Sequence, residues 1–240
     1  MCSRGYKRLF IINLGRTSYK AAWDIQKQLV SLRAKSKIPD CLIVTEHEPV
    51  ITMGRGTHSE NLLVSPPQLR QQGVELHEIE RGGDITFHGP GQVVLYPIVD
   101  LRNRGRDVRQ YLRDLERVVI DSLAELGLKA GVKDGLTGIW VDNHKLGAIG
   151  VAVSRWITYH GVAINVTTDL DYFKLINPCG ITRYPVGSVS QMLGREVTME
   201  KVTELLVGSF VENFHYEPDT TNDIQQLLDE FSETTAAIDG

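Results

Sequence analysis

The sequence contains only three cysteines, at positions 2, 41 and 179. Their odd number and wide spacing suggest neither a disulfide framework nor a C-x-x-C zinc site, so each thiol has to be judged alone. The chain also has no apolar run near the roughly 18 residues that a membrane span needs, and its opening residues lack the apolar core of a signal peptide. These absences predict a cytoplasmic protein without a membrane partner.

The chain has little excess charge of either sign, with 26 Lys and Arg against 30 Asp and Glu and a formal net charge of -4. No global basic field therefore points to nucleic acid as a partner. Residues 219–240 contain six acidic residues and no Lys or Arg, which leaves 26 basic against 24 acidic residues in 1–218, a formal +2. The pattern predicts one nearly neutral domain over 1–218 and an acidic tail over 219–240, either mobile or loosely docked.

Helical and β-branched segments follow one another without strict alternation, which predicts an α/β or α+β domain. The clearest helix covers 107–126, where one apolar stripe is ended by Gly127. A helix is also predicted after Ser18 and another over 199–214, with Thr198 as its N-cap. Strands are predicted at 8–14, 41–45, 50–53, 74–79, 92–99, 139–142, 146–154 and 156–166, the last three as an antiparallel meander. We therefore expect a mixed, largely antiparallel sheet with flanking helices rather than a doubly wound parallel sheet.

Cys179 is the cysteine whose surroundings favour chemistry. It lies in Ile176-Asn-Pro-Cys-Gly180, where Pro178 fixes the approach of the chain and Gly180 leaves the sulfur unshielded. Cys41 opens the apolar run Cys-Leu-Ile-Val and is predicted to be a core residue, whereas Cys2 belongs to the chain terminus. A thiol with a pKa of about 8.5 is mostly protonated at neutral pH. A nucleophilic Cys179 therefore requires a neighbouring cation or base.

Four residues are candidates for that base, namely Lys145, His88, His144 and His160. Lys145 lies in His144-Lys-Leu-Gly-Ala-Ile-Gly150, at the entry to a strand whose small residues allow close approach of backbone and ligand. A solvated hairpin lysine is the plain alternative. His160 precedes small residues of another strand, where a hydrogen-bonded core histidine is the more ordinary interpretation. The residues alone leave the choice open.

The segment Glu80–Gln92 contains four glycines together with Arg81, Asp84 and His88, between two predicted strands. It matches neither G-x-G-x-x-G nor the Gly-Lys-Ser/Thr ending of a P-loop, so a dinucleotide or triphosphate site is not supported. Its backbone N–H groups are suited to binding a carbonyl oxygen or a phosphate. The alternative is a tight turn in which Arg81 pairs with a carboxylate.

Taken together, these segments resemble the octanoyl (lipoyl) transferase family over roughly residues 40–195. Each block is weak alone, but the set is specific in its order and spacing. The blocks are Glu46-His47 with Thr52 to Arg55, Arg81 to Gln92, Lys145 to Gly150, His160 to Asn165, and Pro178-Cys179-Gly180. The resemblance implies a fold related to the catalytic domains of lipoate and biotin protein ligases.

The resemblance also implies an activity, namely transfer of an octanoyl group from octanoyl-acyl carrier protein to a lysine of lipoyl domains in lipoate biosynthesis. The acceptors would be the lipoyl domains of 2-oxoacid dehydrogenases and the glycine cleavage H protein, and neither a cofactor nor a metal is implied. By the same resemblance, Cys179 forms a thioester acyl-enzyme and Lys145 is its base. The implied acyl-binding walls are Arg81, Gly82, Gly83, Asp84, Ile85, Thr86, Phe87 and His88, then Ala148, Ile149 and Gly150, then His160, Gly161, Val162 and Ala163.

Three other activities compete with this interpretation. An ATP-dependent lipoate or biotin ligase would share the fold, but Arg81-Gly-Gly-Asp does not fit the Gly-Gly-Gly run of the lipoate ligases, and Cys179 would be idle. A cysteine acyl hydrolase would use Cys179 with His88 or His160 and give the acyl group to water. A non-catalytic acyl-binding module would not need Cys179 at all.

Five arginines cluster around the start of the helix predicted over 107–126, where cations oppose the helix dipole. Local stability therefore does not explain them, and we expect them to dock the acidic acyl carrier protein, with a solvated basic face as the alternative. They are Arg102, Arg104, Arg106, Arg109 and Arg113.

Overall fold

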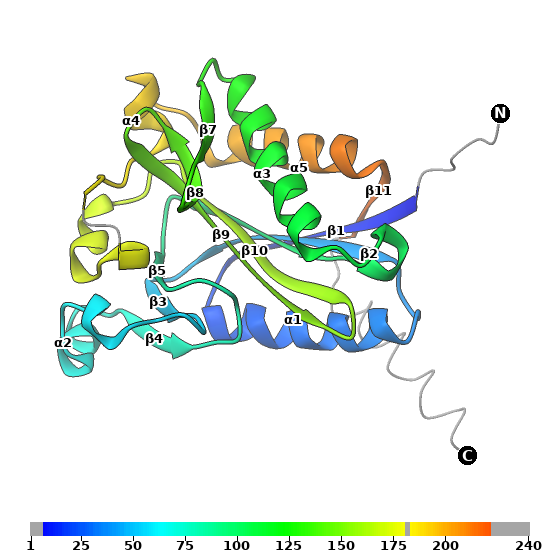
Figure 1. Cartoon of the computed structure of the whole chain (residues 1–240), viewed down its shortest axis with the longest axis horizontal. Helices are drawn as coiled ribbons and strands as arrows, with labels where there is room; N and C mark the ends of the chain where they lie inside the picture. Colours follow the sequence, from blue (N-terminus) through cyan, green and yellow to red (C-terminus); the bar gives the residue numbers. More distant parts are fainter. Residues whose placement is uncertain (1–6, 181–182, 222–240) are drawn as a thin grey trace.

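The framework of the computed structural model, which describes residues 7–180 and 183–221, is an eight-stranded sheet with a three-stranded sheet beside it (Figure 1). The strand order is β11-β1-β2-β6-β10-β9-β8-β7 in the larger sheet and β4-β3-β5 in the smaller one. The strands of the larger sheet are β1 (Lys7–Thr17), β2 (Asp40–His47), β6 (Gln92–Ile98), β7 (Ala130–Lys133), β8 (Leu136–Val141), β9 (His144–Ser154), β10 (Ile157–Asn165) and β11 (Tyr216–Thr221). Those of the smaller sheet are β3 (Val50–Met53), β4 (Glu75–Glu78) and β5 (Ile85–His88).

The larger sheet is mixed and largely antiparallel. Strand β1 pairs in parallel with β2 and β11. The remaining pairs are antiparallel, namely β2–β6, β6–β10, β10–β9, β9–β8 and β8–β7. Strands β8, β9 and β10 form the predicted meander. The expectation of a mixed sheet with flanking helices is therefore confirmed.

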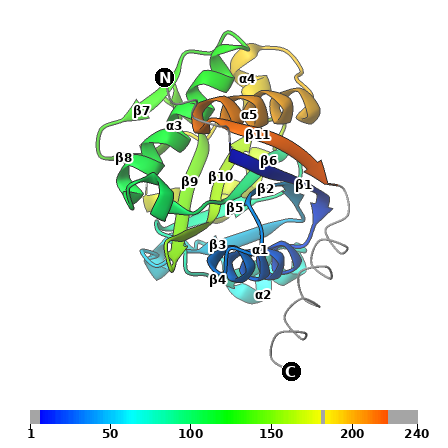
Figure 2. The ribbon, with the colours of Figure 1, turned by 90° about the vertical axis from the view of Figure 1, so that its right-hand side faces the viewer.

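Helices cover both faces of the larger sheet (Figure 2). The α-helices are α1 (Tyr19–Ala34), α2 (Pro66–Gln71), α3 (Val108–Ala124), α4 (Val189–Leu193) and α5 (Met199–Phe214), and the 3-10 helices are η1 (Ser59–Asn61), η2 (Leu101–Arg104), η3 (Leu170–Leu175) and η4 (Pro178–Gly180). Successive strand residues point to opposite faces. Val93 and Leu95 of β6 accordingly share a core with α3 and α5, whereas Val94 and Tyr96 share one with α1.

The three longest helices begin at polar caps that the sequence predicts. The side chain of Ser18 accepts a hydrogen bond from the backbone N–H of Ala21 at the start of α1. Asp107 accepts one at 2.9 Å at the start of α3, and Thr198 accepts one at 3.2 Å at the start of α5. Each cap satisfies an N–H group that has no partner inside its helix. Helix α5 coincides with the predicted range of 199–214.

Apart from the short 3-10 helices, the elements that the sequence did not indicate are β5, β7, α4 and β11. Strand β5 lies inside the glycine-rich segment, and β7 and α4 have only four and five residues. Strand β11 contains Pro218, which is tolerated because β11 is an edge strand of the sheet. Residues 219–221, predicted as the start of an acidic tail, belong to β11; the remainder of that segment, 222–240, lies outside the described residues, as does Cys2.

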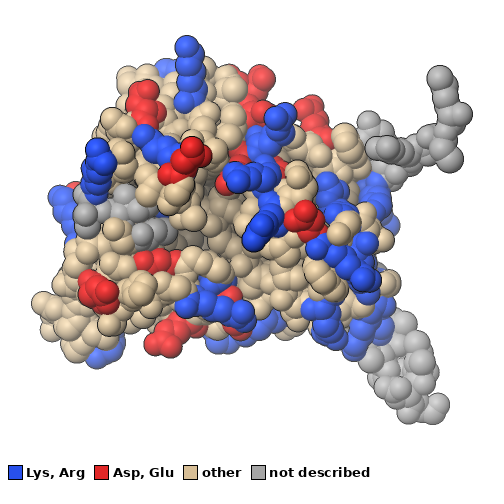
Figure 3. Space-filling model, in the orientation of Figure 1, with Lys and Arg blue, Asp and Glu red and all other residues tan. Residues whose placement is uncertain are grey.

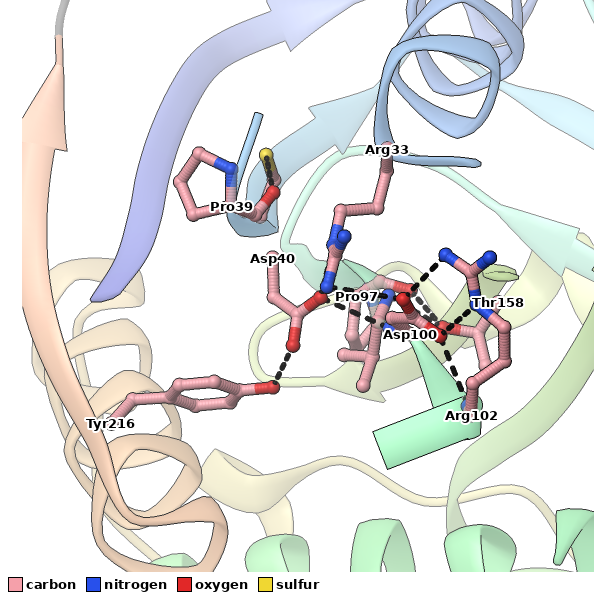
Figure 4. A network of polar contacts seen from close by, with 10 residues as sticks. Arg33, Pro39, Asp40, Pro97, Asp100, Arg102, Thr158 and Tyr216 are labelled. Carbon is pink, nitrogen blue, oxygen red and sulfur yellow. Dashed lines mark hydrogen bonds and ion pairs between the residues drawn. The ribbon is translucent and has the colours of Figure 1, made fainter. Parts of the chain in front are cut away.

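A buried ionic network joins the end of α1 to the starts of β2 and β11 (Figure 4). Asp40 accepts hydrogen bonds from Arg33 Nε at 2.7 Å and from the hydroxyl of Tyr216 at 2.6 Å. Asp100 lies 3.2 Å from Arg33 and accepts hydrogen bonds from Arg102. Both carboxylates are buried. Because each charge has partners, the network fixes these elements without leaving an uncompensated ion.

None of the helices within residues 7–180 and 183–221 is long and apolar enough to cross a membrane.

Candidate active site

Lys145 is held at the start of β9 by backbone bonds on both sides. Its N–H donates to the carbonyl of Pro185 at 2.9 Å, and its own carbonyl accepts from Gly187 N–H at 3.0 Å. The side chain is buried, and its Cε packs over Gly138, where an added Cβ would lie only 2.6 Å away. The segment at 185–187 and the bare backbone of Gly138 therefore fix the path of the Lys145 side chain.

The backbone of Cys179 lies in η4, whereas its side chain lies outside the described part of the structure. A polar chain ties η4 to the glycine-rich segment. The N–H of Asn177 donates to the carbonyl of Asn61 at 2.8 Å, and Asn61 Nδ2 donates to Asp84 Oδ2 at 2.6 Å. Asp84 thus holds, through Asn61, the loop that carries Cys179.

A recess of about 260 Å³, partly open to solvent, brings Lys145 and the η4 loop together. Pro178, the residue before Cys179, lines it together with Lys145. The other lining residues include Gln92, Asn165 and Val186. Two segments that lie far apart in the sequence therefore meet at one opening.

A larger cavity of about 500 Å³, also partly open to solvent, adjoins this recess on the face of the sheet that α1 covers. Thr86, Lys145, Ala148 and Ala163 line both spaces. Its floor consists of paired positions on β6, β10 and β9, in which Ala163 lies opposite Val94 and Ala148. Small side chains at these positions leave room for a narrow apolar ligand.

All but three of the predicted wall residues line this cavity. The exceptions are Gly82, Ile85 and Phe87. Because alternate residues of a strand point in opposite directions, Thr86 and His88 of β5 face the cavity, whereas Ile85 and Phe87 pack into the separate core of the smaller sheet. Gly82 instead donates its N–H to the carbonyl of Val151 at 2.9 Å.

The Arg81 guanidinium is buried beside the glycine-rich loop. Its Nη2 donates to the carbonyl of Thr52 at 2.8 Å and to the Thr52 hydroxyl at 3.0 Å. A Cβ on Gly150 would lie 3.0 Å from Cδ of Arg81, so the glycine leaves the space that the arginine occupies. Arg81 thereby joins β3 to β9 at the wall of the cavity.

A second polar chain runs from His88 to the segment that pairs with Lys145. His88 Nδ1 donates to Gln92 Oε1 at 2.7 Å, since the Gln92 amide nitrogen donates to Asn165 Oδ1 at 2.8 Å. Asn165 Nδ2 then donates to the carbonyl of Gly187 at 3.1 Å. The buried amides therefore position the same backbone that holds Lys145.

Three buried histidines surround the inner part of the site. Burial lowers the pKa of His88 to about 3, and nearby His47 adds to this effect. Burial lowers the pKa of His47 to about 4 and, with the charges of Arg81 and Lys27, that of His160 to about 3. Because their pKa values are lowered, these rings are neutral at pH 7 and are too weakly basic to hold the proton of a cysteine thiol. Lys145 is the amine that lines both spaces.

The cavity has lining residues that the sequence did not indicate, namely Tyr19, Val94, Tyr96 and Thr137. Tyr19 is the first residue of α1, and its hydroxyl lies 3.4 Å from His160 Nδ1. No local pattern distinguishes such a residue from an ordinary core tyrosine. Cys41 is buried, as predicted for a core residue. Within residues 7–180 and 183–221, no group of three or more His, Cys, Asp or Glu side chains is placed to hold a metal ion.

The five arginines lie away from this opening. Figure 3 shows Lys and Arg side chains gathered over η2, the start of α3 and the end of α1. The N–H of Leu101 in η2 donates to the carbonyl of Trp156, which lies just beyond the end of β9. Lys145 lies at the start of β9, and the 11 residues of this strand span about 36 Å. Arg104 also stacks on the Phe214 ring, and Arg102 bonds to Asp100. This placement favours a structural role for these two arginines over contact with a donor at the opening.

The sequence matches a family model described as the lipoyl protein ligase A/B catalytic domain over residues 18–211. It is 49% identical to an octanoyltransferase of Koribacter versatilis over 205 residues, which cover 83% of this chain and 82% of that protein. It is 46% identical to an octanoyltransferase of Geobacter metallireducens, and the match covers 84% of this chain and 92% of that protein. It is 41% identical to an octanoyltransferase of Desulforamulus reducens, and the match covers 90% of this chain and 95% of that protein.

Solved structures share the fold at lower identity. A bipartite lipoate protein ligase from Thermoplasma acidophilum, described with its E2 lipoyl domain, superimposes with a TM-score of 0.71 at 18% identity, covering 95% of this chain and 93% of that one. A lipoate-protein ligase A bound with ATP superimposes with a TM-score of 0.70 at 20% identity, covering 95% of both chains. The chain belongs to the lipoyl protein ligase A/B catalytic domain family, and within it to the octanoyltransferases.

Proposed function

We propose that this enzyme transfers an octanoyl group from octanoyl-acyl carrier protein to a specific lysine of lipoyl domains in lipoate biosynthesis. The observation that carries the proposal is the meeting of Lys145 and the Cys179 loop at the mouth of a cavity floored by small residues. Relatives named octanoyltransferases are 40–49% identical, and one structural neighbour is described with a lipoyl domain. The acceptors are the lipoyl domains of 2-oxoacid dehydrogenases and the glycine cleavage H protein, and the cytoplasm is the expected compartment.

In the first half-reaction, Lys145 accepts the proton of the Cys179 thiol. The thiolate attacks the thioester carbonyl of the carrier, and the tetrahedral intermediate expels the carrier thiolate, which takes the proton back from Lys145. The products are an octanoyl thioester on Cys179 and a free carrier thiol. Because one thioester replaces another, the step needs no ATP.

In the second half-reaction, the amine of the acceptor lysine attacks the Cys179 thioester. Lys145 takes the proton that the amine loses, and the Cys179 thiolate leaves. An amide bond forms as the thioester breaks, and the amide is the more stable product. One base therefore serves both steps.

Binding energy for the acyl chain comes from burial in the cavity. Seven carbon groups at about 0.8 kcal/mol each give at most about 6 kcal/mol. Backbone N–H groups of the glycine-rich segment Glu80–Gln92 are suited to stabilising the oxygen of the reacting carbonyl, which is a separate contribution. Burial of the acyl chain therefore orients the thioester as well as providing affinity.

The two catalytic alternatives differ in what they consume and release. A ligase would activate free octanoate with ATP, and the shared fold alone does not distinguish it from a transferase. A hydrolase built on His88 or His160 is disfavoured, because the pKa of each ring is lowered to about 3 and His88 is bonded to Gln92.

The proposal is tested by supplying an apo lipoyl domain with octanoyl-acyl carrier protein in one reaction and with octanoate plus ATP in another. Mass spectrometry of the lipoyl domain identifies the modified lysine. We expect modification only in the first reaction. Modification only in the second would make the protein a ligase, and free octanoate without modified acceptor would make it a hydrolase.

A further inference from the structure

The cavity ends in aromatic and imidazole rings on the side away from the Cys179 loop. Tyr19, His88, Tyr96 and His160 line this end. Most of their polar atoms have partners in the surrounding protein: the Tyr96 hydroxyl lies 2.7 Å from His47 Nε2, and His88 Nδ1 is bonded to Gln92. His160 Nε2 is the exception, since it is buried without a hydrogen-bond partner. The ring faces of Tyr19, His88 and Tyr96 are available as a stop for a chain end.

The backbone spacing along the cavity floor is close to the length of an eight-carbon chain. Its floor runs along β10 from Ala163, which shares the recess with Lys145, to His160, three residues away and thus about 10 Å. With carbon–carbon bonds near 1.5 Å, an extended chain advances about 1.25 Å per carbon, so the seven bonds of an octanoyl chain span about 9 Å. A thioester at the level of Lys145 and Ala163 therefore places its terminal methyl group against the ring-lined end.

Tyr19 is the part of this end that separates the cavity from the surface. It is almost completely buried, and its ring stacks on His77 with centroids 5.6 Å apart. His77 and the neighbouring Lys20 line a separate groove on the protein surface. A shorter side chain at position 19 would therefore extend the cavity toward the groove.

We propose that Tyr19 sets the acyl-chain length of this enzyme by closing the cavity at about eight carbons. This inference rests on the proposed function, because it requires the acyl chain to enter from the Lys145 end. Tyr19 is held for this role by its position at the first turn of α1, by His77 on one side, and by its hydroxyl contact with His160.

The test compares kcat/KM of the full-length enzyme for hexanoyl, octanoyl, decanoyl and dodecanoyl carrier substrates, with the lipoyl domain as acceptor. In Tyr19→Ala, the ratio of decanoyl to octanoyl is expected to rise about 15-fold, which corresponds to about 1.6 kcal/mol for two more buried methylenes. In Tyr19→Trp, which fills space, the ratio of hexanoyl to octanoyl is expected to rise. Tyr19→Phe keeps the ring and is expected to keep the wild-type order of preference.

Leu29→Ala is the matched control, since it removes buried volume from the same helix at a residue that does not line the cavity. It should leave the order of chain preference unchanged. An unchanged order in both Tyr19→Ala and Tyr19→Trp, while wild type still transfers octanoyl, would overturn the role of Tyr19. Absence of transfer by wild type with every carrier substrate would instead overturn the proposed function.

Discussion

Gly138→Ala tests whether catalysis depends on the position of the Lys145 side chain. An alanine Cβ would lie 2.6 Å from Lys145 Cε and 2.5 Å from the carbonyl oxygen of Gly147. Ordinary contact begins near 3.4 Å, so the lysine has to move by roughly 1 Å. A misplacement of about that size can lower the rate about 100-fold, or about 2.7 kcal/mol in the activation barrier.

The assay is single-turnover acylation of the enzyme by octanoyl-acyl carrier protein, together with urea unfolding to measure stability. Gly138 has a φ of +118°, so alanine there also strains the backbone by about 1–3 kcal/mol. Gly135→Ala is the matched control, because Gly135 also has a positive φ, +75°, but an added Cβ would meet nothing within 4 Å. We expect slow acylation in Gly138→Ala and a near-normal rate in Gly135→Ala. A folded Gly138→Ala enzyme with the wild-type acylation rate would refute the role given to Lys145.

Three further predictions concern stability and the buried polar chains. Because the pKa of His88 is lowered to about 3, its neutral ring contributes stability that is complete above the unfolded pKa of about 6.5. As the pH falls from there toward 3, this contribution to the free energy of unfolding is lost at about 1.4 kcal/mol per pH unit. A free energy of unfolding in urea that is equal at pH 7 and pH 5 would contradict this prediction. Asp40→Ala leaves Arg33 buried without this partner and should lower the free energy of unfolding in the same assay by about 3–5 kcal/mol. The control is Asp24→Ala, which removes an exposed ion pair and should change the free energy of unfolding little. Equal losses in the two variants would argue against the network. Asn165→Ala removes a hydrogen bond to the segment that holds Lys145, worth about 1.4 kcal/mol, and should lower kcat about tenfold; an unchanged kcat would show that the amide chain does not position the lysine.

Features with local sequence signals were predictable. Thr198 and the helical spacing that follows it define α5 because a cap and an apolar stripe are both encoded within a few residues. The same holds for the meander of β8 to β10, whose turns separate β-branched segments. Cys41 was assigned to the core because it opens an uninterrupted apolar strand.

Features that depend on contacts between distant segments were not predictable. Tyr19 lies 141 positions before His160, and no pattern around either residue indicates that their side chains meet. Asp84 was predicted as a wall residue, but its bond to Asn61 shows that it also fixes the loop of Cys179. The division of β5 between the cavity and the core of the smaller sheet was not predictable, because the strand lies within a glycine-rich segment.

The most direct test of the account is the intact mass of the enzyme after incubation with octanoyl-acyl carrier protein in the absence of ATP. The account predicts a single octanoyl adduct on wild type, no adduct on Cys179→Ala, and disappearance of the adduct when an apo lipoyl domain is added and becomes octanoylated. Octanoylation of the lipoyl domain by Cys179→Ala at the wild-type rate would contradict the acyl-enzyme and, with it, the central claim.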